Sequence, residues 1–209
     1  MVQAKNADEF IAKARQAIAS NPDCGASHYN LAVALIGQKR YEEAEGSLKA
    51  AVHCSPNLAE AYVLLGGLCL NRGDLEGCLK YNKDAIHSRA GFSEGHGNIG
   101  FVYLQQGKIE DAIYHLEKAV RWNPRFVQAF SNLANAYLMN GQLDESIEAN
   151  LKAIELEPNF PVAHNNLAIA YLEKGLHELA AKHCDKAREL GYEVAENIVK
   201  EIEAYRSEL

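Results

Sequence analysis

A regular internal repeat runs through most of this 209-residue chain and constrains its fold more than any other feature. The pattern Asn-Leu-Ala-x-Ala-Tyr-Leu begins at Asn132 and again at Asn166. Backward steps of the same length reach related segments at Asn98, Leu64 and Asn30. A repeat of about 34 residues indicates one small structural unit that is copied and stacked on its neighbours. The five units run without insertion over 25–58, 59–92, 93–126, 127–160 and 161–194.

Each unit predicts two helices joined by a tight turn. In the fourth unit, Phe130, Leu133 and Tyr137 recur at the spacing of one helix face. Gly141 then suits the left-handed conformation that ends helices. A second apolar stripe of similar spacing follows, and Pro158 stops it because proline cannot continue the hydrogen-bonded ladder.

Two kinds of small residue recur in phase with the period. A glycine marks the inner turn in four of the five units, and an alanine stands late in the second helix of all five. The alanine lets neighbouring helices approach closely. These residues are Gly73, Gly107, Gly141 and Gly175, and Ala51, Ala85, Ala119, Ala153 and Ala187.

The pattern resembles the tetratricopeptide repeat, whose signature has an aromatic residue, Leu-Gly, Tyr, and later Ala, a bulky apolar residue, Ala and Pro. The third unit matches most of it, at Ile99-Gly100, Tyr103, Ala112, Leu116, Ala119 and Pro124. The second unit departs most, since Cys69, Cys78, Asn82 and Ala90 replace signature residues.

The resemblance implies an all-α fold, a right-handed superhelical solenoid of about twelve helices. We expect a single domain over 1–209, with an N-terminal half-repeat helix over 7–22 ahead of the five units. A C-terminal helix over 195–209 is expected to cap the apolar face that the last unit of a stack exposes. Its apolar side comprises Val194, Ile198, Ile202, Tyr205 and Leu209.

The resemblance also implies that the first helix of each unit lines a concave groove that holds peptides. Asparagine stands at one groove-facing position in four units, as Asn30, Asn98, Asn132 and Asn166, and Asn135 lies nearby. Asparagine both donates and accepts, so a row of them is suited to holding an extended backbone. The row resembles the asparagine ladder of O-linked N-acetylglucosamine transferases, interrupted at Leu64. The alternative is that these asparagines only form hydrogen bonds on the helix surface.

An apolar stripe is predicted beside the asparagines. Within it, Phe101, Leu104, Leu138 and Leu172 are candidate peptide-binding residues, as are the five asparagines. If the stripe is exposed, it favours a partner segment with spaced apolar side chains, or a helix in the groove. The alternative is that it packs against the following unit.

Charge and hydropathy exclude several partners. The formal net charge is −7, and no run of Lys or Arg is present, which disfavours nucleic acid. Every apolar run is too short to cross a bilayer, so we expect no membrane insertion. The first ten residues lack the apolar core of a secretion signal, and we expect a cytoplasmic location.

The sequence contains no pattern typical of a catalytic or metal centre. The five cysteines form no CxxC pair, and three of the eight histidines recur at the signature aromatic position, at His28, His96 and His164. A phosphate-binding glycine loop and a nucleophile elbow are missing too. We therefore expect no enzyme, no metal and no cofactor.

Two local features stay open. Gly95 and Gly97 in one predicted helix indicate either close helix packing or a compliant joint near 88–97. Cys69 and Cys78 lie on facing helices of one unit, and the two alternatives for them are a buried thiol pair and a redox switch.

The predicted function is a non-catalytic scaffold that binds an extended or helical segment of a protein partner in its groove. The alternatives are self-assembly into a homo-oligomeric platform and a regulatory repeat domain of an enzyme complex. Light scattering over a concentration series separates a monomeric adaptor from a platform.

Overall fold

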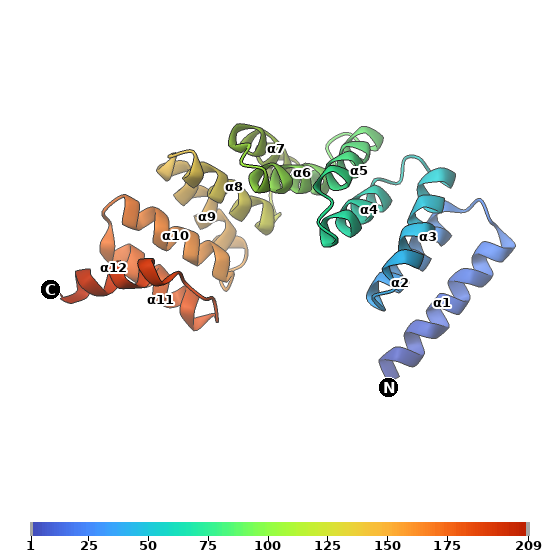
Figure 1. Ribbon diagram of the computed structural model, residues 1–209, viewed down its shortest axis with the longest axis horizontal. Coiled ribbons are helices and arrows are strands. Elements are labelled where there is room, and N and C mark those ends of the chain that lie inside the picture. The colour runs from blue at the N-terminus through green and yellow to red at the C-terminus, as the bar shows by residue number, and fades with distance from the viewer. Residues whose placement is uncertain (1, 208–209) are drawn as a thin grey trace. The chain divides into compact units, whose positions relative to one another are not determined.

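The computed structural model describes residues 2–207, with side chains from Asp8 onward. Over these residues the chain forms twelve α-helices and no strand, which confirms the predicted all-α repeat fold (Figure 1). The helices are α1 Val2–Ser20, α2 Gly25–Gly37, α3 Tyr41–Cys54, α4 Ala59–Asn71, α5 Leu75–Ser88, α6 Ser93–Gln105, α7 Ile109–Trp122, α8 Val127–Met139, α9 Leu143–Leu156, α10 Pro161–Glu173, α11 His177–Glu189 and α12 Glu196–Ser207.

The helices pair as the period predicts. The two helices of one repeat pack together in α2 with α3, α4 with α5, α8 with α9, and α10 with α11. Each second helix then packs on the first helix of the next repeat, as α3 does on α4, α7 on α8, and α9 on α10. In these pairs each helix buries its apolar face against its neighbours, so each repeat depends on the adjacent ones for a core.

The inner turns have the predicted left-handed backbone. The four turn glycines have φ values of 79°, 69°, 74° and 70°, at Gly73, Gly107, Gly141 and Gly175. In the first repeat the same turn places Lys39 at φ 60°, the only non-glycine residue with positive φ over the described residues. The turn geometry is therefore kept even where glycine is missing.

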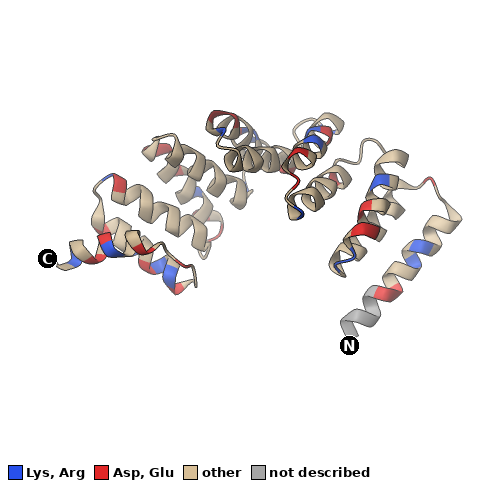
Figure 2. Ribbon diagram, in the orientation of Figure 1, with Lys and Arg blue, Asp and Glu red and all other residues tan. Residues whose placement is uncertain are grey.

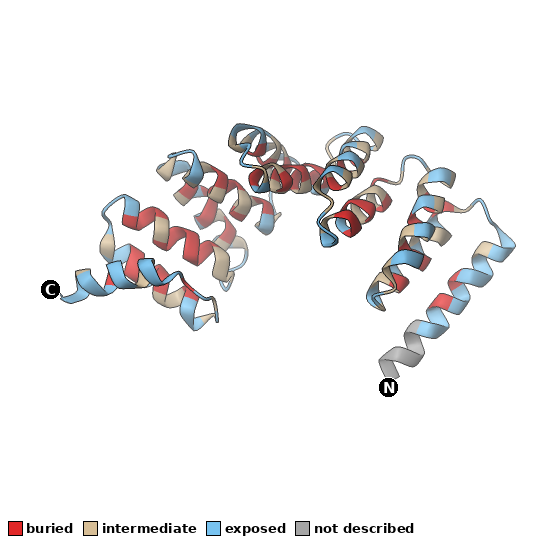
Figure 3. Ribbon diagram, viewed as in Figure 1, coloured by how far each residue is buried: buried red, intermediate tan, exposed pale blue. Residues whose placement is uncertain are grey.

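The chain divides into two compact units, Met1–Val102 and Tyr103–Leu209, and the boundary falls within α6. In the first unit, helices α1 to α4 form a core that contains Leu35, Leu48 and Leu65. A smaller cluster contains Cys69 and Cys78. The second unit has one core around Leu116 and another around Leu167. The five late alanines are fully buried. Figure 3 colours buried residues red, and red stretches lie on helices of both units.

The first and last helices differ slightly from their predicted bounds. Helix α1 begins at Val2 rather than at residue 7, and Ile11 and Ala14 on it are buried against α2. Helix α12 contributes Ile202, which is 2% exposed, to the core around Leu167. Leu209, predicted on the same apolar face, lies outside the described residues.

Helix α10 is enclosed more fully than the other helices. Nine of its thirteen residues are buried, and Figure 2 shows it with almost no charged residue, whereas α11 and α12 carry many. Its buried residues include the polar His164, Asn165 and Asn166 as well as apolar ones, so α10 is enclosed on polar and apolar sides alike.

Gly95 lies where α5 and α6 approach closely. A Cβ atom on Gly95 would stand 2.7 Å from Cγ2 of Ile86, so a larger residue would push the helices apart. This contact accounts for the glycine through packing. The compliant joint near 88–97 stays a prediction.

Candidate functional site

The predicted asparagine row differs in accessibility along the chain. Asn30 is exposed on α2, and Asn132 and Asn135 are half-buried on α8. Asn98 on α6 is half-buried as well, whereas Asn166 on α10 is only 8% exposed. The asparagines therefore do not offer equal access to a ligand, and peptide binding by them stays a prediction.

Asn98 is engaged by a buried asparagine of the preceding helix. Its side-chain amide donates to Oδ1 of Asn82 at 2.9 Å, and the Asn82 amide donates to the carbonyl of Cys78 at 2.8 Å. Asn82 is fully buried, and a Cβ on Gly66 would stand 2.3 Å from its Nδ2. Asn98 thus satisfies a buried acceptor.

The same pair of positions recurs two repeats later, at Asn150 and Asn166. Asn150 is fully buried and donates to the carbonyl of Ser146 at 3.1 Å, but its Oδ1 has no hydrogen-bond partner among the described residues. Leu116 stands at the corresponding position before Asn132. Asn98 and Asn166 therefore follow buried asparagines, whereas Asn132 does not.

Two of the four predicted stripe residues are buried in helix packing. Leu104 and Leu172 are 8% and 6% exposed and belong to the cores of the second unit. Phe101 is half-buried and packs on the cluster around Cys69. Leu138 is half-buried on α8.

A hollow of 430 Å³ lies across consecutive first helices of the first unit. Its apolar lining comes from Tyr29 on α2, Val63 and Leu64 on α4, and Phe92 just before α6, and its charged lining from Glu60, Arg89 and Glu94. Leu64 is the residue that interrupts the asparagine row.

One ion pair organises this hollow. Arg89 pairs with Glu60, and the guanidinium lies 4.3 Å from the centre of the Phe92 ring. Burial acts to raise the pKa of Glu60, but hydrogen bonding and the charge of Arg89 outweigh it and lower that pKa. Glu60 therefore stays ionised, and Glu94 adds a second carboxylate.

These lining residues were not predicted from the sequence to form a site. Tyr29 and Val63 stand one repeat apart, as do Glu60 and Glu94. These four residues could therefore have been found from the repeat period. Arg89 and Phe92 lie outside the helices, in the connection before α6. Phe126 and Phe160 repeat the position of Phe92 one and two repeats later, whereas no periodic pattern points to Arg89.

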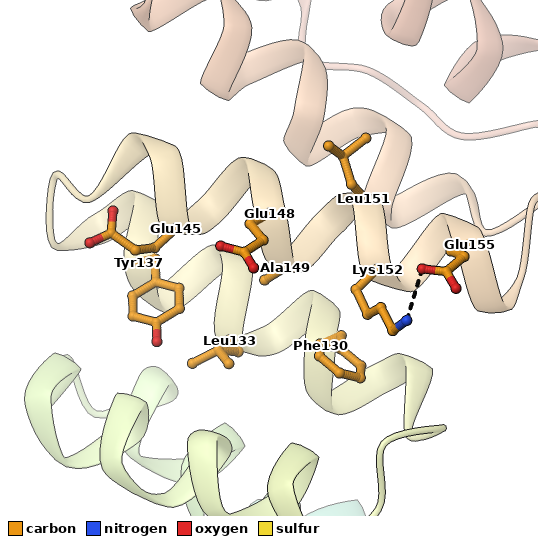
Figure 4. A pocket seen from close by; sticks show the side chains of 9 residues that line it. All are labelled: Phe130, Leu133, Tyr137, Glu145, Glu148, Ala149, Leu151, Lys152 and Glu155. Atoms are coloured by element: carbon orange, nitrogen blue, oxygen red, sulfur yellow. Dashed lines mark hydrogen bonds and ion pairs between the residues drawn. The ribbon is translucent and has the colours of Figure 1, made fainter.

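A second hollow, of 620 Å³, lies between α8 and α9 in the second unit (Figure 4). Phe130, Leu133 and Tyr137 line it in a row along α8. The α9 side contributes Glu145, Glu148, Ala149, Leu151, Lys152 and Glu155. We call this the α8–α9 crevice.

Among the described residues, no three His, Cys, Asp or Glu side chains gather in a way that would hold a metal ion. His164 and His183 form a buried pair with Nδ1 atoms 2.9 Å apart, and Nε2 of His164 contacts the carbonyl of Pro158 at 3.0 Å. Both ring nitrogens of His164 are thereby engaged in polar contacts within the fold.

In the described part of the chain, no helix combines the length and apolarity that a membrane span requires.

Comparisons with known families decide the family. A TPR repeat model matches residues 100–141 and 136–175, and a tetratricopeptide repeat model matches residues 6–59. Together the matches cover more than half of the chain. The chain belongs to the tetratricopeptide repeat (TPR) family. No curated protein matches it.

Solved TPR structures share the fold. The chain is 26% identical to MamA residues 41–end from Desulfovibrio magneticus RS-1, with TM-score 0.68, over 80% of this chain and 94% of that one. PilF of Pseudomonas aeruginosa has TM-score 0.82 at 16% identity, over 98% and 92% of the two chains. YrrB, a TPR protein with an unusual peptide-binding site, has TM-score 0.69 at 21% identity, over 85% and 91%.

Proposed function

We propose that the chain is a protein-interaction scaffold that binds an extended or helical segment of a partner along its first helices. The TPR fold is a protein-interaction fold, and membership of the family supports the general role. The observation that supports this particular surface is the hollow whose lining comes from α2, α4 and the start of α6.

In the first unit the hollow suits a bulky apolar side chain. Tyr29, Val63 and Leu64 supply apolar surface, and Glu60 and Glu94 supply carboxylates at its edge. Aromatic and aliphatic linings with a few polar groups are typical of ligand sites.

In the second unit Asn132 and Asn135 suit the backbone of the same kind of segment. Both are half-buried on α8, and neither side chain makes a hydrogen bond within the described part of the chain. Each amide is therefore available to donate and to accept. One such bond contributes about 0.5–1.5 kcal/mol, so several must act together.

Panning a phage-displayed library of random peptides on the full chain tests the proposal. Fluorescence anisotropy then gives the affinity of the recovered peptide. We expect the Asn132→Ala/Asn135→Ala variant to bind about tenfold more weakly, which corresponds to about 1.4 kcal/mol. Val63→Asp is expected to weaken binding at the first-unit hollow because it adds a charge to an apolar wall.

The matched control is Asn57→Ala/Asn159→Ala, which removes two exposed asparagines that lie between helices. This control is expected to keep the wild-type affinity. Unchanged affinity in both test variants, with helicity intact, would refute binding by the first helices. Self-assembly stays a prediction, for which a mass above one 23.0 kDa chain in light scattering is the evidence required.

A further inference from the structure

The α8–α9 crevice lies on the side of α8 opposite to the asparagines. At about 100° per residue, Phe130, Leu133 and Tyr137 share one face of α8, whereas Asn132 and Asn135 point the other way. The crevice is thus a surface that the proposed function does not use.

The floor of the crevice is apolar. Phe130 and Tyr137 are half-buried, Leu133 between them is 5% exposed, and Leu151 on α9 is 42% exposed. A volume of 620 Å³ is within the range of about 300–1,000 Å³ that is typical of ligand pockets. The space is therefore sufficient for apolar side chains of a docked segment.

The walls of the crevice are acidic. Glu145, Glu148 and Glu155 line it, and Tyr137 donates its hydroxyl hydrogen to Oε1 of Glu117 at 2.8 Å. Lys152 is the only cation of the lining, and its ammonium group bonds Glu155 at 2.8 Å (Figure 4). Glu145 and Glu148 are exposed and have no cation partner among the described residues.

Tyr137 on the floor lies within reach of these carboxylates. Burial, the hydrogen bond to Glu117 and the charges of Glu117, Glu145 and Glu148 together raise the pKa of Tyr137. The carboxylates of the walls place negative potential over the apolar floor, which favours a cationic ligand.

The next repeat provides an internal comparison. A hollow of 510 Å³ lies there among α9, α10 and α11, and six of its lining residues stand one full repeat after lining residues of the α8–α9 crevice. Lys182 replaces Glu148, and Asp185 replaces Leu151. The repeat geometry thus produces the hollow, whereas the acidic and apolar character belongs to the α8–α9 copy.

We infer that the α8–α9 crevice docks a basic amphipathic segment of a partner protein, with apolar side chains on Phe130, Leu133 and Tyr137 and with Lys or Arg beside Glu145 and Glu148. The charge complementarity selects this occupant over an acidic or neutral segment. The amphipathic pattern follows from an apolar floor between acidic walls.

Three synthetic fluorescein-labelled peptides test the inference on the full chain by anisotropy. The first has leucine at helical i, i+3, i+4 and i+7 positions and lysine elsewhere, the second replaces lysine with glutamate, and the third replaces leucine with alanine. We expect saturable binding of the lysine–leucine peptide, and at least about tenfold weaker binding of the other two. Equal binding of the three peptides, or no saturable binding of the first, would overturn the inference.

Charge reversal locates the site. Glu145→Lys/Glu148→Lys is expected to weaken the lysine–leucine peptide by about tenfold or more, because it removes two carboxylates from the wall and adds two cations. Glu173→Lys/Glu178→Lys changes the net charge equally at exposed positions outside the crevice lining, and is expected to change the affinity less than about twofold.

Two further outcomes separate this site from others. Asn132→Ala/Asn135→Ala is expected to leave lysine–leucine peptide binding unchanged, which distinguishes the crevice from the first-helix surface. Equal weakening by both charge-reversal pairs would mean general attraction to an acidic protein and would overturn the inference. A dimer that Glu145→Lys/Glu148→Lys dissociates, without peptide binding, would assign the crevice to a second copy of the chain instead.

Discussion

The side-chain amide of Asn98 on α6 donates to Oδ1 of Asn82 on α5, at 2.9 Å. Asn82 occupies a position where the TPR signature has a bulky apolar residue, and it is fully buried. The bond satisfies a buried acceptor that would otherwise lack a partner. Asn98 is thus a structural residue as well as a candidate ligand-binding one.

The Asn98→Ala substitution is expected to lower the free energy of unfolding by about 1–3 kcal/mol, since it leaves Oδ1 of Asn82 buried without a donor. Asn132→Ala removes no hydrogen bond within the described residues and is expected to change stability by less than about 0.5 kcal/mol. Urea unfolding followed by circular dichroism measures both values. Equal losses in the two variants would contradict the structural role of Asn98.

The buried pair of His164 and His183 predicts a pH dependence. Nε2 of His164 must donate to the Pro158 carbonyl, so its Nδ1 accepts from Nδ1 of His183 when both rings are neutral. Burial, the neighbouring His164 and the charge of Lys182 lower the pKa of His183 from 6.5 to about 4.

In this window the unfolded chain binds a proton at residue 183 and the folded chain does not. Stability is therefore full above the unfolded pKa and falls as pH drops from 6.5 towards 4, by up to roughly 3 kcal/mol from this residue. His183→Phe keeps an aromatic ring and is expected to flatten the dependence, whereas the exposed His53→Gln is expected to retain the wild-type slope. Identical slopes in all three proteins, from urea unfolding at a series of pH values, would contradict the assignment.

The turn at Lys39 predicts a stabilising substitution. Lys39 has φ 60°, which is costly for a residue with a Cβ, and the other four turns have glycine there. Lys39→Gly is expected to raise the free energy of unfolding by about 1 kcal/mol. The converse control, Gly107→Ala, is expected to lower the free energy of unfolding by a similar amount. A loss of stability in Lys39→Gly would contradict the presence of backbone strain at Lys39.

The five cysteines are expected to differ in reactivity in the folded protein. Cys24 stands just before α2, and hydrogen bonds involving Ser27 lower its pKa. Burial raises the pKa of Cys69, Cys78 and Cys184, with that of Cys78 at about 11. Ellman's reagent near neutral pH is expected to react fastest at Cys24 and slowly at the three buried thiols, and Cys24→Ser is expected to remove the fastest phase. A fast phase that persists in Cys24→Ser would contradict this order.

Much of the fold could be predicted because the repeat period constrains it. The positions of Gly73 and Ala85 within the period are enough to predict a left-handed turn and a close helix contact, and both are present. Lys39 shows that the turn is imposed by the packing of its two helices even without a favourable residue. The start of α1 at Val2 was not predicted, since the first apolar periodic residues come later.

Less of the candidate site could be predicted. Whether Asn98 faces a ligand or a buried partner depends on Asn82, which lies on another helix and departs from the signature. The burial of Leu172 depends on how α10 is enclosed. The hollow near Tyr29 includes Arg89, and no other repeat has a cation at the corresponding position. Side-chain contacts between elements, rather than the pattern within one, decide these points.

Hydrogen–deuterium exchange of the full chain, with and without the peptide selected from the random library, tests whether the first helices form the binding surface. The peptide is expected to slow exchange chiefly in the first helices, α2, α4 and α8, while α3, α5 and α9 change little. Protection confined to the second helices, or none at all under saturating peptide, would contradict the claim that the first helices form the binding surface.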